Sequence, residues 1–463
     1  MATTPAHEKA AIQLLRLAQT GLGTLKPAEE TLVRGAAVGE TAILGPDYPF
    51  VSDAANADTG PRSWGPEREI RAEVIRWLCV DAEARKLVDP HGVGLVGARI
   101  TGGLNLSYMK IPFPIDLSLC RLTSDARFIR CQIPMLSLTG SWTAAIAVDG
   151  ADIKYSVFLD VGFRADGEVS LNGAHIGVNL ECDEGTFMNK SGAAIQANLI
   201  NVGGAILLRA GSQMERGKSR PFRAKGAVWL VGARIGGDLD CSGGEFVNEG
   251  VAIYLARAQV AGTIFFRGRS ANEGGGDLMF KAGGVDLRGT SAGALEDEPS
   301  SWTSSSSFKL EGFTYGGINP ADPAQRLKWL ELDKSEATPP TQPYRQAKVL
   351  GDSGDRKGAE LVLRTMEGIL SSKELFLMRW LRKSIGYGYS PGNAFVGLAV
   401  VTGAGWLVYW RANRMAMMVP TEKSAAQSLK SPVVALPNEY PRFNSFIFSL
   451  ENTFPLVKLG LNR

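Results

Sequence analysis

The sequence predicts a mainly β protein: a right-handed parallel β-helix (solenoid) with an N-terminal helical cap, a C-terminal helical hairpin and a membrane segment. Three observations support this prediction. A short apolar motif recurs between residues 91 and 318. Glycine supplies 54 of the 463 residues, a larger share than the average of about 7%. One long uncharged stretch lies near the C-terminus. The 50 basic and 47 acidic residues nearly balance, which disfavours a nucleic-acid-binding protein.

Residues 1–90 are predicted to form the helical cap. The segment AHEKAAIQLLRLAQ places apolar residues at helical spacing, and a break rich in glycine and proline follows it. The segment PEREIRAEVIRWLCVDAEAR begins with Pro66 and has acidic residues in its first turn, which favours a helix start there. Its apolar stripe consists of Ile70, Val74, Ile75, Trp77 and Leu78.

A repeated motif defines the predicted solenoid, residues 91–318. It reads VGLVGARITGGLNL at 93–106, VSLNGAHIGVNLEC at 169–182 and VWLVGARIGGDLDC at 228–241. Alternating apolar and polar residues are typical of a strand with one buried face, and strands this short gain stability only by stacking. Weaker copies of the motif lie between the strong ones. When they are counted, we expect one turn of the solenoid about every 20–25 residues, and three turns between strong copies that are about 58 residues apart.

The alignment of these copies predicts which side chains face the interior. Cys182 is level with Cys241, and Leu104 is expected to lie at the same level. The chain has no CxxC pair, and its first residues, MATTPAHEKA, lack the apolar stretch of a signal peptide, so we expect no secretion and buried, reduced thiols. Outward positions are expected for Glu181, Asp240 and Asn105. Positive φ angles at sharp corners are expected for Gly97, Gly173, Gly232 and Gly289.

The region after the motif changes character. Three polar stretches, 212–223, 268–276 and 291–307, are predicted to be loops that protrude from the solenoid. Residues 319–372 are predicted to form a linker and a helical hairpin. Within them, YRQAKVLGDSGDRKGAELVLRTMEGILSS has apolar residues at helical spacing on both sides of a GDSGD turn.

Residues 373–463 are predicted to form a membrane module. The segment AFVGLAVVTGAGWLVYW is uncharged and near the lower length limit for a membrane span. The alternative is a buried core helix, and the closing FNSFIFSLENTFPLVKLG is interfacial, re-entrant or packed against the span. The predicted membrane segment includes Ala394, Leu398, Val401, Trp406, Tyr409 and Trp410. The predicted basic residues at an anionic membrane surface are Lys373, Arg379, Arg382, Lys383, Arg411 and Arg414.

Several segments are distinctive when taken together: GARITGGLNL, GARIGGDLDCSGGEF, QPYRQAKVLGDSGDRKGAELVL, GYGYSP and FNSFIFSLENTFPLVKLG. They resemble a bacterial group of membrane-associated β-solenoid proteins, similar to pentapeptide-repeat proteins and often labelled membrane-associated oxidoreductases. The resemblance covers about residues 65–463. It implies a cytoplasmic solenoid tethered to the inner membrane, and it carries no catalytic residue over to this chain.

The sequence contains no strong catalytic motif. GVGLVG at 92–97 has the glycine pattern of dinucleotide-binding proteins, but a helix precedes it and a strand-like segment follows it, contrary to what that motif requires. With only three histidines, general bases and zinc ligands are few. We predict no catalytic, cofactor-binding or metal residues. An outward acidic patch, of the kind that binds calcium in some β-helix enzymes, or a simple solvated face, is predicted for Glu181, Asp183, Glu184, Asp238, Asp240 and Glu245.

Three functions follow from this organisation. The first is a membrane-anchored scaffold that presents an extended surface to a protein partner or to a second copy, without nucleic acid or cofactor. The second is an oligomeric membrane pore gated by the solenoid. The third is an enzyme, either a nucleotide-dependent oxidoreductase or a carbohydrate-active enzyme. A bias of basic residues before the membrane segment favours a solenoid in the cytoplasm.

Overall fold

The computed structural model divides into two compact units, residues 1–358 and 359–463. Helix and strand are about equally abundant, so the chain is a mixed α and β protein rather than the mainly β protein that the sequence predicts. The described residues are 5–44, 64–211, 220–269, 281–298, 302, 307–333, 342–370, 391–415, 417–418 and 443–453.

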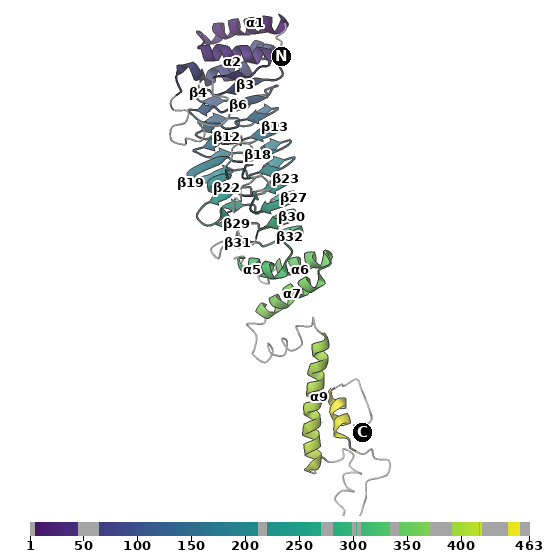
Figure 1. The fold of residues 1–463 in the computed structure, drawn as a ribbon. Helices are drawn as coiled ribbons and strands as arrows, with labels where there is room; N and C mark the ends of the chain where they lie inside the picture. The colour runs from purple at the N-terminus through teal and green to yellow at the C-terminus, as the bar shows by residue number, and fades with distance from the viewer. Residues whose placement is uncertain are drawn as a thin grey trace, which may run out of the picture. The chain divides into compact units, whose positions relative to one another are not determined.

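Helices cover the N-terminal end of the stacked strands (Figure 1). The helices are α1 (Pro5–Leu22), α2 (Pro27–Val38), α3 (Ala72–Val80) and α4 (Ala82–Leu87). The predicted helix start at Pro66 is wrong: Pro66–Arg68 form a 3-10 turn, η2, and Glu69–Arg71 form strand β2. The reason is tertiary, because β2 pairs in register with the next strand of its sheet.

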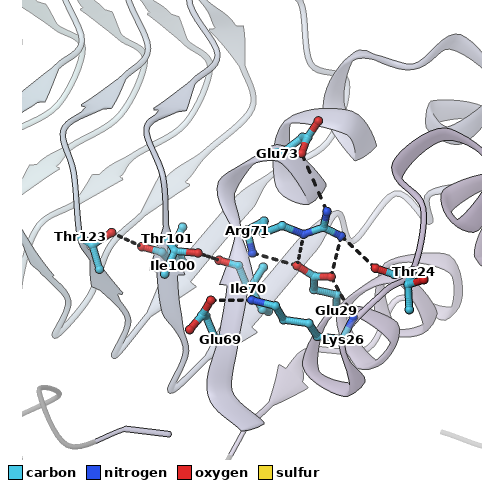
Figure 2. A network of polar contacts seen from close by, with 10 residues as sticks. All are labelled: Thr24, Lys26, Glu29, Glu69, Ile70, Arg71, Glu73, Ile100, Thr101 and Thr123. Carbon is cyan, nitrogen blue, oxygen red and sulfur yellow. Dashed lines mark hydrogen bonds and ion pairs between the residues drawn. The ribbon is translucent and has the colours of Figure 1, made fainter. Parts of the chain in front are cut away.

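A buried carboxylate fastens α2 to β2 (Figure 2). Glu29 is fully buried, and its Oε1 and Oε2 accept hydrogen bonds from Nε and Nη2 of Arg71 at 2.8 and 2.9 Å. Burial by itself raises the pKa of Glu29, but these bonds and the N–H groups of Lys26 and Arg71 outweigh it and lower that pKa. A fully paired buried charge of this kind fixes the position of the helix.

The strands among the described residues form two sheets of 16 strands each. The first contains β1 (Ala42–Ile43), β3 (Val93–Val96), β6 (Ile115–Ser118), β10 (Leu136–Ser137), β14 (Val157–Phe158), β18 (Leu180–Glu181), β21 (Ile206–Leu207), β24 (Leu239–Asp240), β27 (Gln259–Phe266), β23 (Arg234–Ile235), β20 (Asn201–Val202), β17 (His175–Ile176), β13 (Asp152–Ile153), β9 (Gln132–Ile133), β30 (Ser291–Asp297) and β32 (Thr314–Asn319). The second contains β2, β4 (Arg99–Thr101), β7 (Arg121–Leu122), β11 (Trp142–Thr143), β15 (Arg164–Ala165), β19 (Thr186–Gln196), β16 (Val169–Ser170), β12 (Ile146–Ala147), β8 (Ala126–Arg127), β5 (Leu104–Asn105), β22 (Arg223–Trp229), β25 (Glu245–Val247), β26 (Ile253–Tyr254), β28 (Lys281–Ala282), β29 (Gly284–Asp286) and β31 (Ser307–Lys309).

Each strand pairs in parallel with a strand one circuit later, where a circuit is the stretch of chain between two paired strands. One inward row shows this register, and its members are buried except for the partly buried last one. The circuits in this row span 21 to 33 residues, as read from the numbers of the paired residues. The row consists of Ile115, Leu136, Val157, Leu180, Ile206, Leu239, Ile264, Leu295 and Ile318.

Two details of the predicted repeat are wrong. Leu180 and Leu239 are two circuits apart, with Ile206 between them, so the longer spacing contains two turns and not three. Leu104 is not level with them, because it pairs with Ala126 in the other sheet. The motif at 93–106 therefore occupies the opposite half of its circuit from the motif at 169–182.

Left-handed backbone at two corners explains why the motif fits either half of a circuit. One corner row contains Gly97, Leu119, Gly140, Val161 and Glu184, and the other contains Gly150, Gly173, Leu199, Gly232, Arg257 and Gly289, all with positive φ. The positive φ predicted for the repeat glycines is confirmed. Residues with side chains adopt the same backbone at several levels of both rows, so the stack imposes this conformation even where it is unfavourable.

The interior between the sheets is apolar. The predicted burial of Cys182 and Cys241 is confirmed, and burial raises the pKa of both thiols well above the usual value. A row of buried phenylalanines stacks with ring centroids 5.1–5.3 Å apart. It consists of Phe163, Phe187, Phe222 and Phe246.

The C-terminal end of the strands is covered by α5 (Pro323–Glu331) and α6 (Gln342–Asp352). Nη1 of Arg326 lies 2.5 Å from Oδ1 of Asp297, and both side chains are fully buried. Nε2 of Gln342 donates hydrogen bonds to the carbonyl oxygens of Leu310 and Phe313 at 2.6 and 3.1 Å. The amide of Gln342 thus satisfies two backbone acceptors at the end of the stack, where no further strand is present to pair with them.

The predicted loop at 291–307 is partly wrong, because Ser291–Asp297 form β30, with Leu295 buried between Ile264 and Ile318. Residues 212–219 and 270–276 of the other predicted loops lie outside the described residues. The predicted helical pair is confirmed as α6 and α7 (Arg356–Leu370). The second unit contains α9 (Pro391–Arg414) and α11 (Ser445–Thr453).

The corner glycines give a test of this backbone. Gly173 has a φ of 63°, and a Cβ built there meets no atom within 4 Å, so Gly173→Ala adds backbone strain alone. We expect a loss of about 1 kcal/mol in the free energy of unfolding. Gly103 is equally open but lacks positive φ, so Gly103→Ala is expected to be neutral or slightly stabilising. Chemical unfolding of both variants checks this, and equal midpoints would contradict it.

Candidate functional site

A row of arginines with one tryptophan runs across the outer face of the second sheet. Arg99, Arg121, Trp142 and Arg164 lie on successive circuits and are paired in register. The guanidinium carbon of Arg121 lies 4.5 Å from the ring centroid of Trp142, and that of Arg164 lies 4.7 Å from it. Because an indole face attracts cations, Trp142 holds both guanidiniums in place.

An aspartate orients the far side of this row. The indole Nε1 of Trp142 donates a hydrogen bond to Oδ2 of Asp166 at 2.7 Å, and Nε of Arg164 donates to Oδ1 at 2.8 Å. Asp166 therefore fixes the plane of the indole and balances the charge of Arg164. The fixed indole in turn fixes Arg121, which lies on the opposite side of the ring.

A surface pocket of about 390 Å³ opens beside this row. We call it the arginine pocket. The residues that line it belong to β4, β7 and β11 or follow these strands. It is lined by Arg99, Arg121, Leu122, Thr123, Trp142, Thr143, Ala144 and Asp166.

One carboxylate, Glu69, lies next to this row. Glu69 is the register neighbour of Arg99, but its Oε1 lies 2.5 Å from Nζ of Lys26 (Figure 2). The hydrogen bond from Lys26 lowers the pKa of Glu69.

The predicted acidic patch is not one continuous carboxylate surface. Leu207 lies between Glu181 and Asp240 in the register. Arg209 bridges two of the carboxylates, with Nη2 2.6 Å from Oδ2 of Asp183 and Nη1 3.7 Å from Oδ2 of Asp240.

The remaining acidic residues have other settings. Glu245 lies in the second sheet, where Nη2 of Arg223 is 2.8 Å from its Oε2. Oδ1 of Asp238 accepts the backbone N–H of Thr263 at 2.7 Å, and Glu184 is a corner residue. Within the described ranges, no group of three or more His, Cys, Asp and Glu side chains is placed to hold a metal ion.

One carboxyl group near Arg209 is strongly perturbed. Burial raises the pKa of Asp160 to about 6, and the nearby carboxylates of Glu181 and Asp183 add to this effect. The hydroxyl of Thr139 donates a hydrogen bond to Oδ1 of Asp160 at 2.7 Å, which opposes the rise. Sequence reasoning missed Asp160, whose polar side chain is buried at the end of an apolar strand.

The glycine pattern at 92–97 lies in strand β3, which pairs with β1 and β6. The chain continues into β4, so the helix N-terminus that would hold a dinucleotide does not follow it in the fully described segment 64–211. In this protein, the segment forms strand β3 and the corner at Gly97.

The predicted membrane residues lie on α9. Val401, Trp406 and Trp410 are exposed, while Leu398 and Tyr409 are partly exposed. Ala394 belongs to the same helix. Arg411 and Arg414 lie in its last turn, with the guanidinium of Arg414 4.3 Å from the ring centroid of Trp410. The other predicted basic residues, Lys373, Arg379, Arg382 and Lys383, lie outside the described residues.

Comparisons with protein-family models, with curated proteins and with solved structures found no match for this chain. The sequence did contain a signal for the arginine pocket. The residues Arg99, Arg121, Trp142 and Arg164 recur every 21 or 22 positions, which is the length of the circuits in this part of the stack. Outward residues do not show the alternation of apolar and polar types that marks a strand. Only a search for residues that recur at the circuit length would find this row.

Asp160 gives a pH test. Its pKa of about 6 in the folded protein lies above the ordinary value of 3.8, so the folded state retains a proton that the unfolded chain loses. Ionisation of Asp160 therefore lowers the stability as pH rises from about 4 to about 6. Asp160→Asn removes this loss, and we expect it to gain on the order of 3 kcal/mol relative to the wild type between pH 4 and pH 7.5.

The measurement is chemical unfolding of the full chain at both pH values. Asp152→Asn is the matched control, because Asp152 is an exposed carboxylate on β13. Its stability relative to the wild type is expected to change little with pH. A parallel response of the two variants would argue against a buried, protonated Asp160.

Proposed function

We propose that this protein is a membrane-anchored β-solenoid that binds a partner on the outer face of its strands. The solenoid part of this proposal is a right-handed parallel β-helix over residues 91–318. It is supported by parallel pairing in register, by recurring corners, and by inward rows that run through many circuits. Parallel strands joined by crossovers in one sheet are right-handed in nearly all proteins.

The observation that carries the membrane part is the exposed apolar surface of α9. Residues Phe395–Arg414 form a helix long and apolar enough to cross a membrane, and only 6% of its most apolar window is buried. Side chains of Phe395, Val400 and Val408 are 64–70% exposed. Water would solvate such a surface poorly, whereas a lipid bilayer is its natural solvent.

Basic residues suggest the orientation. Arg411 and Arg414 follow the span closely, and four basic residues precede it within about 20 positions. The excess on the N-terminal side favours a cytoplasmic solenoid at the inner membrane of a bacterium. We infer that the second unit anchors the chain at an anionic leaflet.

A second candidate function is an oligomeric pore. On α11, Ser449 donates a hydrogen bond to the carbonyl oxygen of Thr402 at 2.7 Å, and Glu451 is buried beside it. An ionisable residue next to a membrane span is a common feature of ion pathways. This candidate predicts that purified protein conducts ions across a planar bilayer and that Glu451→Gln reduces the conductance.

Vesicle flotation tests the anchor. We expect the full chain to float with liposomes after alkaline carbonate extraction. The double substitution Val400→Asp with Leu407→Asp is expected to leave most of the protein in the soluble fraction, because each buried charge costs about 3 kcal/mol in a membrane span. The matched control is Val178→Asp with Val247→Asp, which changes exposed valines of the strand region. Wild-type protein that stays soluble without detergent would refute the anchor.

A further inference from the structure

We propose that the helices at the C-terminal end of the strands form an autoinhibitory lid, and that displacement of this lid admits an extended strand of a partner protein beside β31. The lid consists of α5, the two residues that follow it, Leu332 and Asp333, and α6. This contact is distinct from binding on the outer face. The lid and the strands that it covers lie in the first unit, so this contact is independent of the membrane helix.

The lid continues a row of hydrogen bonds that strands make elsewhere in the stack. Leucine N–H groups of the second sheet donate to a backbone carbonyl one circuit later, as where Leu287 donates to Lys309 at 2.8 Å. The next leucine of this row, Leu310, donates to the side-chain Oδ1 of Asp333 at 3.2 Å. A carboxylate of the lid thus takes the place that the carbonyl of a further strand would occupy.

Two other groups of the lid also act as substitutes for a strand. The carbonyl of Leu332 accepts the N–H of Phe308 at 3.0 Å. The side-chain Nε2 of Gln342 donates to the carbonyls of Leu310 and Phe313. The lid therefore occupies the hydrogen-bonding edge of β31 and of the residues after it, and an added strand must displace the lid to reach that edge.

Polar groups supply much of the contact between the lid and the stack. Arg326 is the one fully buried side chain among those described on α5, and it is paired with Asp297. On α6, Gln342 and Gln346 are buried, and Leu350 is the one large apolar side chain described there that is buried. Water replaces polar partners when the lid opens, so such contacts stabilise the closed state less than apolar burial does.

One of these polar groups opposes closure. Gln346 is fully buried, yet neither its Nε2 nor its Oε1 has a hydrogen-bond partner among the described residues. The hydroxyl of Tyr315, on the strand that α6 contacts, is buried in the same condition. A buried polar group without a partner destabilises the closed lid, because water satisfies that group when the lid is open.

The N-terminal end of the stack is covered in a different way. The buried carboxylate of Glu29 is fully paired with Arg71 there, and α2 contacts the first strands. An intact second copy therefore offers no free strand edge at that end, and the occupant that fits is an extended segment of another protein. The fully buried apolar side chains of the N-terminal helices include Leu14, Leu32, Val33, Ile75 and Leu78.

The buried rows of the stack define the sequence that such a segment needs. Val285 pairs with Phe308, and two residues further along each strand Leu287 and Leu310 are buried as well. Alternate residues of a strand face the same side of a sheet. A parallel segment beside β31 therefore needs two apolar residues separated by one position, to extend these two rows.

Hydrogen exchange of the full chain in detergent micelles tests the lid. We expect the amides of α6 and the N–H groups of Phe308 and Leu310 to exchange together, at least a hundredfold faster than the amides of α2. Gln346→Met removes the unpartnered amide and is expected to slow this exchange by about tenfold or more. Gln325→Met changes an exposed glutamine of α5 and is the matched control, for which no change is expected.

Fluorescence anisotropy tests the strand that the open end accepts. The probe is a labelled peptide with the sequence GVDLRGT, which is that of residues 284–290 and contains the two apolar residues of β29 and its continuation. We expect Gln342→Ala, which removes two hydrogen bonds of the lid, to bind this peptide about tenfold more tightly than the wild type. Gln346→Met is expected to bind it about tenfold more weakly, because apparent affinity follows the fraction of open lid. The control peptide, GDDDRGT, has aspartate at both apolar positions and is expected not to bind.

Three results would each overturn the proposal: exchange of α6 only together with α2, protection of β31 while α6 exchanges, or equal binding or no binding of the peptide across the wild type and both variants. Self-association of Gln342→Ala without peptide would identify a second copy as the occupant and would overturn the assignment to a partner protein. None of these results affects the flotation experiment, so the anchor and the lid stand or fall separately.

Discussion

Backbone pairing between successive circuits is the constraint on which the rest of this structure depends. Most strands in the first circuits contain two residues, too few to be stable alone. Their N–H and C=O groups bond to the circuit before and the circuit after, as where Val157 donates to the carbonyl of Asn179. No circuit satisfies its own backbone, so each one requires neighbours whose strands begin at the matching residue.

The corners enforce that register. Residues with positive φ recur at the same two places in the circuit, and Leu119, Val161 and Leu199 adopt this conformation although it costs a residue with a Cβ roughly 1–2 kcal/mol. The surrounding pairs outweigh that cost. Because the register is fixed, outward residues also form rows, and the arginine pocket lies along one of them.

The sequence made the strands, the corner glycines and the buried thiols of Cys182 and Cys241 predictable, because each follows from a local pattern. The number of circuits between Leu180 and Leu239 was not predictable, since extra residues within β19 and after Gly211 lengthen two circuits and disguise the period. Strand β30 was not predicted because SAGALED has only one large apolar residue, Leu295. The other residues of this strand are covered by the neighbouring strands β27 and β32. The arginine pocket was missed because exposed residues have no apolar alternation.

The end coverings have a consequence for how many copies of this chain can join. A parallel stack has no intrinsic length: its last strand presents the same unpaired donors and acceptors as every strand before it. Here Leu332 accepts the N–H of Phe308 and Gln342 occupies two carbonyls at one end, while α2 lies against β1, β2 and β3 at the other. These helices cover the unpaired edges of the terminal strands. A proteolytic cut that released either of them would expose such an edge, to which the strands of a second copy would pair, and repetition of this step would give filaments.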